Sequence, residues 1–459
     1  MMHNIDIDVV EMTMDVMKYA INRITKSDPE MGLAISEEEL KEKVGETITD
    51  KGIGGVKAFE LFREVLVKHT VSIDNPKHLA FVPAAPTRAA ILFDLVTAAS
   101  SIHGSYWMEG AGGIFCENEA MSWIVSLTGL PEGSFGVFTS GGTAANLSAI
   151  VTAREAWRSN SKENKLSRGI ILCSSQAHSS VKSMAKIIDA DIIAIKTQDP
   201  LGSNDLNQTF KELSTKDQDR VFAVVASAGT TNAGIIDSLD EVALFCSQHN
   251  LWMHVDAAYG GGALMSDTVR GEFKGIELAD SITIDPHKWF FAPYDCGAII
   301  YKNPELAKNA HSQHGSYLEI FNQKGMEGFN PSDYQIQLTR RLRGLPLWFS
   351  LAMHGTERYK KAVNSALSLA AQAAKMIEED YSYLSMVRPV SLSVVLFKRE
   401  GWTSDDYRKW TLKNLEDNVA LVTPTYYEID GKMESIARFC FINPETDQED
   451  IREILDSMN

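Results

Sequence analysis

The sequence predicts an α/β protein whose central domain is a mostly parallel, mixed sheet with helices on both faces. Between residues 76 and 345, short apolar runs are separated by longer amphipathic stretches. These runs are apolar throughout rather than at alternate positions, which is typical of strands that are covered on both faces. A composition of 44% hydrophobic and 23% charged residues suits a globular chain with a sizeable core. The predicted strands are 170–173, 221–227, 252–255, 281–284 and 297–301.

The first 75 residues are predicted to form a helical segment. Apolar residues recur at helical spacing from Val9 to Met17, and Ser36 with Glu39 forms the pattern of a capping box ahead of a second helix. Short helices of this kind rarely form a core alone. We therefore expect residues 1–75 to pack on another domain or to mediate dimerisation.

Residues 346–459 are predicted to form a smaller α+β domain. A stretch rich in Ala and Leu at 362–377 predicts a long helix. Thr446 and Glu449 are expected to cap a last amphipathic helix. Two strand-like segments lie between these helices, 393–397 and 437–442.

Charge and composition exclude several classes of function. The chain has 44 Lys and Arg against 61 Asp and Glu, and the net charge of −17 repels nucleic-acid phosphates, so no nucleic-acid partner is expected. Five scattered cysteines without a C-x-x-C pair predict reduced thiols, with neither a disulfide framework nor a metal site. An acidic N-terminus and the lack of an apolar stretch of about 18 residues predict a cytoplasmic protein without a membrane partner.

Polar residues follow the carboxyl ends of four predicted strands. His178 follows the first strand, Thr231 the second, Asp256 the third and Lys288 the fourth. Ligands of open α/β sheets bind at this edge, so these side chains are expected to converge there. Each one alone has an ordinary structural explanation, since an exposed lysine or a helix-capping aspartate is common. Their combination is what favours an active site.

A run of small residues adds a further element. Residues 139–146 read TSGGTAAN and open a predicted helix, and backbone N–H groups at such a start form an anion site. Pyridoxal phosphate needs this whole set: a phosphate cradle, a lysine for the covalent link and a carboxylate that keeps the pyridinium nitrogen protonated. Burial in a pocket is expected to lower the pKa of Lys288 towards the reactive neutral amine.

Three sequence blocks resemble the group II pyridoxal-phosphate-dependent amino acid decarboxylases, which include aromatic L-amino acid and glutamate decarboxylases. The blocks are AHSS at 177–180, HVDAAY at 254–259 and DPHKW at 285–289, and segments at 75–83 and 340–343 match in the same order. The resemblance implies a fold-type I subunit, similar to aspartate aminotransferase. It also implies a homodimer with active sites shared between the subunits.

The resemblance also implies roles for individual residues. Lys288 would carry the cofactor covalently, Asp256 would pair with the pyridinium nitrogen, and His178 would stack on the ring and meet the substrate carboxylate. The residues expected to bind the cofactor are Gly141, Gly142, Thr143, His178, Thr231, Asp256, Ala258, His287 and Lys288.

Tyr317 lies in a polar, glycine-containing stretch that matches the family's mobile catalytic loop. In the family this loop comes from the neighbouring subunit, and its tyrosine protonates the carbon left after CO2 departs. A phenylalanine there would be typical of aldehyde-forming relatives. Asp285 differs from several relatives, which have Asn. Because a carboxylate repels a phosphate, we expect His287 rather than Asp285 to contact it.

The substrate side chain is expected to bind near Phe81, Pro83 and Ala84, whose apolar character favours an aromatic or bulky L-amino acid. Lys77 and His78 nearby would suit an acidic substrate instead. The predicted activity is decarboxylation of an L-amino acid to an amine and CO2, with an aromatic substrate favoured. The alternatives are an acidic or diamino acid decarboxylase, an aldehyde synthase or aminotransferase of the same fold, and an inactive scaffold.

Overall fold

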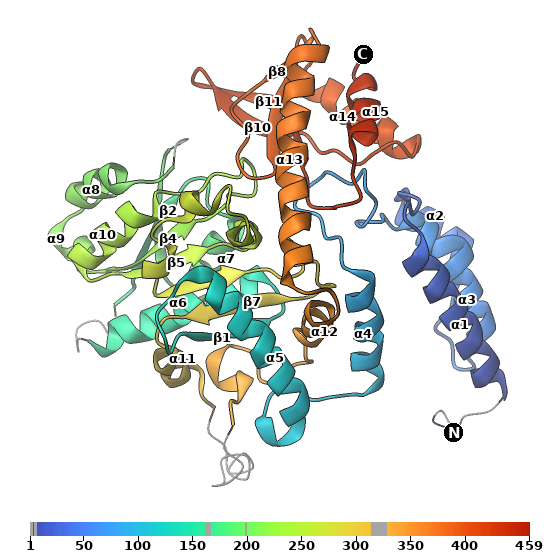
Figure 1. Ribbon diagram of the computed structural model, residues 1–459, viewed down its shortest axis with the longest axis horizontal. Helices are drawn as coiled ribbons and strands as arrows, with labels where there is room; N and C mark the ends of the chain where they lie inside the picture. The colour runs from blue at the N-terminus through green and yellow to red at the C-terminus, as the bar shows by residue number, and fades with distance from the viewer. Residues whose placement is uncertain (1–2, 4–6, 161–166, 198–199, 314–327) are drawn as a thin grey trace. The chain divides into compact units, whose positions relative to one another are not determined.

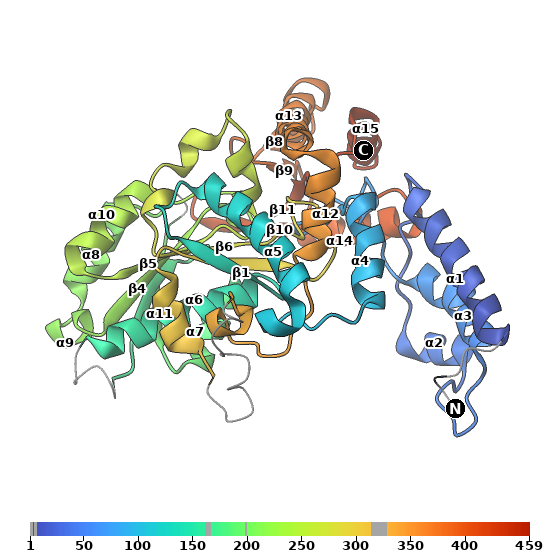
Figure 2. The same ribbon diagram turned by 60° about the horizontal axis from the view of Figure 1, so that its bottom comes forward.

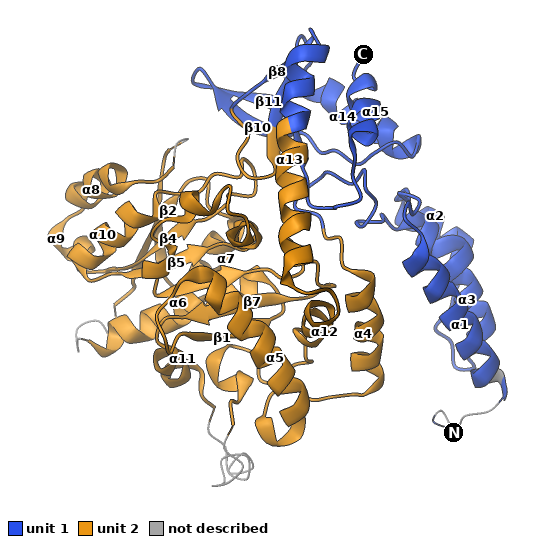
Figure 3. Ribbon diagram, viewed as in Figure 1, with its two compact units in different colours: residues 1–83, 372–388, 396–459 blue, residues 84–371, 389–395 orange. Residues whose placement is uncertain are grey.

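The computed structural model describes all residues except 1–2, 4–6, 161–166, 198–199 and 314–327. Two compact units make up the chain (Figure 3). The larger unit contains residues 84–371 and 389–395, and the smaller unit contains residues 1–83, 372–388 and 396–459. The division expected from the sequence, at residues 75 and 345, stays a prediction.

A seven-stranded mixed sheet forms the centre of the larger unit, in the order β1-β7-β6-β5-β4-β2-β3 (Figure 1). β7 runs antiparallel to both of its neighbours, and the other strand pairs are parallel. This confirms the predicted α/β fold with a mostly parallel sheet. The strands are β1 (Phe135–Thr139), β2 (Ile170–Ser174), β3 (Asp191–Ile195), β4 (Val221–Ser227), β5 (Trp252–Asp256), β6 (Ser281–Ile284) and β7 (Gly297–Tyr301).

Helices lie on both faces of this sheet (Figure 2), which is why β2, β4, β6 and β7 are buried along their whole length. On one face Ile150 and Met184, from two helices, pack with Phe222 of β4. The helices of the larger unit are α4 (Arg88–Ala99), α5 (Trp107–Thr128), α6 (Gly142–Ser159), α7 (Ser179–Ile187), α8 (Ser203–Glu212), α9 (Thr215–Gln218), α10 (Leu239–His249), α11 (Pro304–His311) and α12 (Leu345–His354). Helix α13 (Thr356–Asp380) has residues in both units. Among the described residues, no helix combines the length and the apolar character that a membrane span requires.

The smaller unit combines N-terminal helices with a four-stranded sheet in the order β10-β11-β9-β8. Ser36 and Glu39 form the predicted capping box at the start of a helix. The predicted strands at 393–397 and 437–442 overlap β9 and β11. The elements are α1 (Ile7–Thr25), α2 (Glu37–Val44), α3 (Gly55–Leu61), β8 (Leu384–Met386), β9 (Val394–Arg399), α14 (Ser404–Glu416), β10 (Thr425–Ile429), β11 (Lys432–Cys440) and α15 (Gln448–Asp456).

The cap predicted for the last helix is wrong by one residue. Asp447 is the N-cap of α15, and its side chain forms a capping box with Asp450. The Thr446 hydroxyl instead donates to the carbonyl oxygen of Pro76 at 2.6 Å. Asp competes well with Thr as an N-cap, and here the threonine has a tertiary partner that local sequence does not reveal.

A buried ion pair connects α5 to the segment before α12. The Arg340 guanidinium donates to both carboxylate oxygens of Glu117, at 2.9 and 2.8 Å, and the side chains are 0% and 3% exposed. Arg340 also donates to the carbonyl oxygen of Gly104, and the Gly344 N–H donates to Glu117. Removing one partner of such a pair leaves an uncompensated charge in the interior.

Replacing Glu117 with alanine is therefore expected to lower the free energy of unfolding by about 3–5 kcal/mol. Urea denaturation followed by circular dichroism measures this change. Lys41→Ala is the control, because the pair of Lys41 with Glu37 is mostly exposed and such pairs contribute little. Equal denaturation midpoints for the two variants would contradict the stabilising role of the buried pair.

Candidate active site

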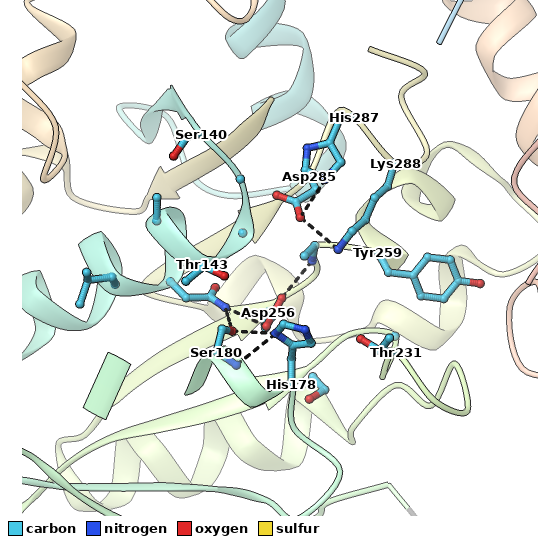
Figure 4. Close-up of a pocket in the computed structure, with 18 of the residues that line it drawn as sticks. Ser140, Thr143, His178, Ser180, Thr231, Asp256, Tyr259, Asp285, His287 and Lys288 are labelled. Carbon is cyan, nitrogen blue, oxygen red and sulfur yellow. Dashed lines mark hydrogen bonds and ion pairs between the residues drawn. The ribbon is translucent and has the colours of Figure 1, made fainter. Parts of the chain in front are cut away.

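A cavity of about 520 Å³ lies at the carboxyl ends of the strands in the larger unit. The chain segments that follow β1, β2, β4, β5 and β6 line it (Figure 4). The topology therefore brings together the polar residues that the sequence places after separate strands. All nine residues predicted to bind the cofactor line this cavity: Gly141, Gly142, Thr143, His178, Thr231, Asp256, Ala258, His287 and Lys288.

The two glycines after β1 leave the start of α6 open. Gly141 has a φ of +135°, which residues with a side chain rarely adopt, and α6 begins at Gly142. A Cβ on Gly142 would lie 2.9 Å from Asp285 Oδ2 and 3.3 Å from the Cβ of Ala258. The backbone N–H groups in the first turn of this 18-residue helix carry the positive end of its dipole. This geometry suits a phosphate group.

Asp256 is the last residue of β5 and is 8% exposed. Its Oδ1 accepts a hydrogen bond from the Ala258 N–H at 3.1 Å, and its Oδ2 accepts one from Asn146 Nδ2 at 2.9 Å. These two donors fix the orientation of the carboxylate and use both of its oxygens as acceptors. Because Asp256 also lines the cavity, it can pair with a cationic group there.

His178 is the N-cap of α7 and is exposed at the cavity (Figure 4). Its Nδ1 accepts from the Ser180 N–H at 3.2 Å and lies 2.9 Å from the Ser180 hydroxyl. These two contacts fix the ring orientation. The exposed imidazole can therefore contact a planar ring or an anionic group in the cavity.

The amine of Lys288 lies 3.0 Å from Asp285 Oδ2, and His287 Nε2 lies 3.6 Å from the same oxygen (Figure 4). Burial alone would lower the pKa of Lys288, but the carboxylates of Asp285 and Asp256 outweigh it and raise that pKa above its usual value. The expectation of a lowered pKa is therefore wrong for the chain without cofactor. Asp285 Oδ1 is buried and has no hydrogen-bond partner within the described part of the chain.

Three further predicted residues do not line this cavity, and a fourth, Tyr317, lies outside the described residues. Phe81, Pro83 and Ala84 are not among the residues that line the cavity; Phe81 is 63% exposed, whereas Pro83 and Ala84 are buried. Their assignment to a substrate pocket stays a prediction.

Three residues at the site have contacts that the sequence did not predict. Asn146 donates to Asp256 and to Ser180, and the Ser180 hydroxyl lies within hydrogen-bond distance of His178. A polar residue on the buried face of an Ala-rich helix is the signal that could have found Asn146. Tyr259 lines the cavity with its ring stacked on Trp289, the ring centres 5.2 Å apart. Its hydroxyl lies 2.6 Å from that of Ser393.

A lysine, a carboxylate and an open helix start, gathered at one edge of a mostly parallel sheet, define an α/β enzyme that uses a phosphorylated cofactor. A family model described as the pyridoxal-dependent decarboxylase conserved domain matches residues 39–400. The chain belongs to this family, whose members are lyases. The protein is therefore an enzyme that depends on pyridoxal phosphate.

The curated relatives include several activities. An aromatic-L-amino-acid decarboxylase of Bacillus atrophaeus is 29% identical over 99% of this chain and 94% of its own length. An L-2,4-diaminobutyrate decarboxylase of Acinetobacter baumannii is 28% identical over 78% of this chain and 74% of its own length. A 4-hydroxyphenylacetaldehyde synthase of Rhodiola rosea is 26% identical, over 73% of this chain and 70% of that protein.

Solved structures share the fold over nearly the whole chain. Oryza sativa TDC, solved with pyridoxal phosphate and tryptamine, aligns with a TM-score of 0.88 at 20% identity and covers 98% of this chain and 97% of that one. Mouse CSAD aligns with a TM-score of 0.89 at 21% identity, with coverage of 99% and 98%. These similarities confirm a fold-type I architecture.

Gly141→Ala is expected to raise the dissociation constant for pyridoxal phosphate about tenfold or more. The added methyl group strains the backbone at φ +135° by about 1–3 kcal/mol, and relief of that strain would turn the first N–H groups of α6 away from the cavity. Titration of the apoenzyme followed by visible absorbance measures the constant. Gly271→Ala is the control, since a Cβ there meets nothing within 4 Å. An unchanged affinity in Gly141→Ala would rule out this loop as the phosphate cradle.

Proposed function

We propose that this enzyme decarboxylates an L-amino acid to the corresponding amine and CO2, and that the substrate is aromatic. The observation that carries the proposal is the convergence of Lys288, Asp256 and His178 at one cavity, beside an open helix start. When bound there, pyridoxal phosphate supplies an electron sink for the electron pair that departing CO2 leaves behind.

Gly141 and Gly142 would bind the phosphate through the backbone N–H groups at the start of α6. His287 is the side chain we expect to add a contact. Its pKa is lowered by burial, so the ring is mostly neutral at pH 7 and can donate one hydrogen bond. Asp285 holds the amine of Lys288 at 3.0 Å, which places the lysine beside the phosphate site.

Asp256 would keep the pyridinium nitrogen cationic. Its two oxygens already accept hydrogen bonds from Ala258 and Asn146, so the carboxylate is held in a fixed orientation. A cation opposite this carboxylate gains electrostatic stabilisation. Lys288 would carry the cofactor covalently once its amine has lost a proton.

His178 would lie against the cofactor ring and orient the substrate carboxylate. Tyr317 is proposed as the general acid that protonates the substrate carbon after CO2 has left, a role that rests on its position in the sequence. The chain is also proposed to work as a homodimer, which sedimentation velocity tests. Large exposed apolar side chains on the N-terminal helices support this, among them Ile7, Met14 and Val56.

Two observations favour an aromatic over an acidic substrate. Lys77, which suggested an acidic substrate, forms an ion pair with Glu453 at 3.0 Å. Burial lowers the pKa of His78, so its ring is mostly uncharged at pH 7. Neither residue is therefore left as an unpaired cation. The full-length similarity to the aromatic-L-amino-acid decarboxylase supports the same choice.

An aldehyde synthase is the second candidate, because the Rhodiola rosea relative is a 4-hydroxyphenylacetaldehyde synthase. A panel of the twenty L-amino acids with 2,4-diaminobutyrate and sulfinate analogues distinguishes the candidates when CO2, amine and aldehyde are all measured. Aromatic substrates with amine products are expected. Turnover of diaminobutyrate or acidic substrates alone would contradict the proposed substrate class.

Lys288→Ala is expected to abolish turnover and the visible absorbance of covalently bound cofactor, because no other side chain offers an amine at this position. Absorbance spectra and intact-protein mass after borohydride reduction measure the covalent link. Lys274→Ala serves as the control, since its amine is exposed and pairs only with Asp240. If Lys288→Ala shows the same mass increase after borohydride reduction as the wild type, Lys288 does not carry the cofactor.

Tyr317→Phe is expected to lower amine formation about a hundredfold or more, because a phenyl ring cannot donate a proton. It is also expected to shift product towards aldehyde, with dissolved O2 as the two-electron oxidant and with ammonia and hydrogen peroxide released. Product chromatography with a CO2 assay measures both effects. An unchanged rate and product ratio would exclude Tyr317 as the proton donor, while leaving Lys288 and Asp256 in their proposed roles.

A further inference from the structure

Asn146 lies in the second turn of α6 and is 1% exposed. Its amide nitrogen donates to Asp256 Oδ2 at 2.9 Å and to the Ser180 hydroxyl at 3.2 Å. Its amide oxygen lies 3.0 Å from His254 Nε2. One buried amide therefore contacts three polar side chains, two on β5 and one on α7, and no sequence motif assigns it a role.

A second set of buried polar groups lies behind Asn146. His254 Nδ1 lies 2.8 Å from the hydroxyl of Ser281, and that hydroxyl accepts from the indole N–H of Trp252 at 2.8 Å. His254 and Asp256 are two residues apart on β5, so their side chains lie on the same face of the strand. His254 and Ser281 are 0% exposed.

The Asp256 end sets the direction of this chain of hydrogen bonds. The Asn146 NH2 group donates to Asp256 Oδ2, so its oxygen faces His254 Nε2 and can only accept there. The Ser281 hydroxyl accepts from the indole of Trp252 and can still donate to His254. His254 then carries its proton on Nε2, and its Nδ1 accepts from Ser281.

The protonation of His254 agrees with this direction. Burial lowers its pKa to about 4, so the imidazole is neutral at pH 7 and carries a single proton. Among the described residues, Asp256 on the same strand is the charged group that affects the pKa of this ring. A neutral ring donates from one nitrogen and accepts at the other, as the chain requires.

The same amide reaches His178 through a branch. The second N–H of Asn146 points to the Ser180 hydroxyl. Ser180 in turn contacts His178 Nδ1 through its hydroxyl (Figure 4), and its backbone N–H donates to the same nitrogen. Because Nδ1 of His178 is thus an acceptor, Nε2 is the ring nitrogen that carries a proton.

We propose that Asn146 is a positioning residue that joins Asp256 and His178 in one directional hydrogen-bond network, anchored by His254, and that this network keeps both oxygens of Asp256 as hydrogen-bond acceptors. The proposal rests on the role proposed above for Asp256. A proton on Asp256 Oδ2 would face the NH2 group of Asn146, and one on Oδ1 would face the N–H of Ala258, so neither would have an acceptor.

The first test compares Asn146→Ala with Ser148→Ala, which removes a buried hydroxyl from the same helix that bonds to the Ala144 carbonyl oxygen instead. Asn146→Ala is expected to keep the covalent link at Lys288 but to lower kcat about tenfold to a hundredfold, with KM within about twofold. The alkaline limb of its kcat profile should move to lower pH by about one unit, because the ring nitrogen is held less firmly as a cation. Ser148→Ala should keep the wild-type profile.

The second test acts one step further from the cofactor and does not depend on Asn146→Ala folding well. His254→Leu removes the donor to Asn146 and is expected to shift the pH profile in the same direction as Asn146→Ala. His254→Gln places an amide N–H near the position of Nε2 and is expected to have a pH profile close to that of the wild type. Equal shifts in the two His254 variants would overturn the proposed direction of the network.

The third test needs no cofactor and no activity. Nitrogen NMR of the apoenzyme labelled at histidine reports which ring nitrogen carries the proton, and the Nε2–H form is expected for His254 and His178. An Nδ1–H form of His254 in the wild type would overturn the proposal. Wild-type pH profiles in both Asn146→Ala and His254→Leu would also overturn it, with Asp256 retaining its role. If Asp256→Ala itself keeps the wild-type profile, the proposed function of Asp256 fails and the network proposal fails with it.

Discussion

A carboxylate buried at the end of a strand is the constraint on which the site depends. Asp256 is removed from water, so each of its oxygens needs a donor, and these donors come from the backbone after β5 and from α6. An ionised group can stay in such a place only where the surrounding dipoles are already oriented towards it. The fold meets this requirement by placing the second turn of α6 beside the end of β5, where Asn146 donates to Asp256.

The charges at the cavity are balanced in pairs. Asp285 faces the amine of Lys288, and the open start of α6 lies beside the same carboxylate. Without cofactor the two carboxylates hold the lysine in its charged form, in spite of burial. Arrival of an anionic, electron-poor ligand would alter this balance, because the helix start and the carboxylates then have new partners. The pKa of Lys288 thus depends on all the charged groups around its amine and not on burial alone.

Much of the fold could be predicted from the sequence, because strands buried on both faces leave continuous apolar runs. The runs at 221–227, 281–284 and 297–301 have the same bounds as β4, β6 and β7. Local chemistry was less predictable. The choice of Asp447 over Thr446 as a cap and the direction of the pKa change at Lys288 both depend on partners far away in sequence. Asn146 was missed for the same reason, since its importance comes from His254 and Asp256, more than a hundred residues later.

The antiparallel strand β7 has a consequence for how the amine is held. Parallel neighbours need a long crossover, but β6 and β7 run in opposite directions and are joined by residues 285–296 alone. Two backbone hydrogen bonds lie within this connection. The His287 N–H donates to the Cys296 carbonyl oxygen, and the Ala292 N–H donates to the carbonyl oxygen of Pro286. Lys288 therefore lies in a short, internally hydrogen-bonded connection between two core strands. Longer crossover loops elsewhere in the sheet would be tolerated at little cost, whereas an insertion in residues 285–296 would displace the amine nitrogen of Lys288.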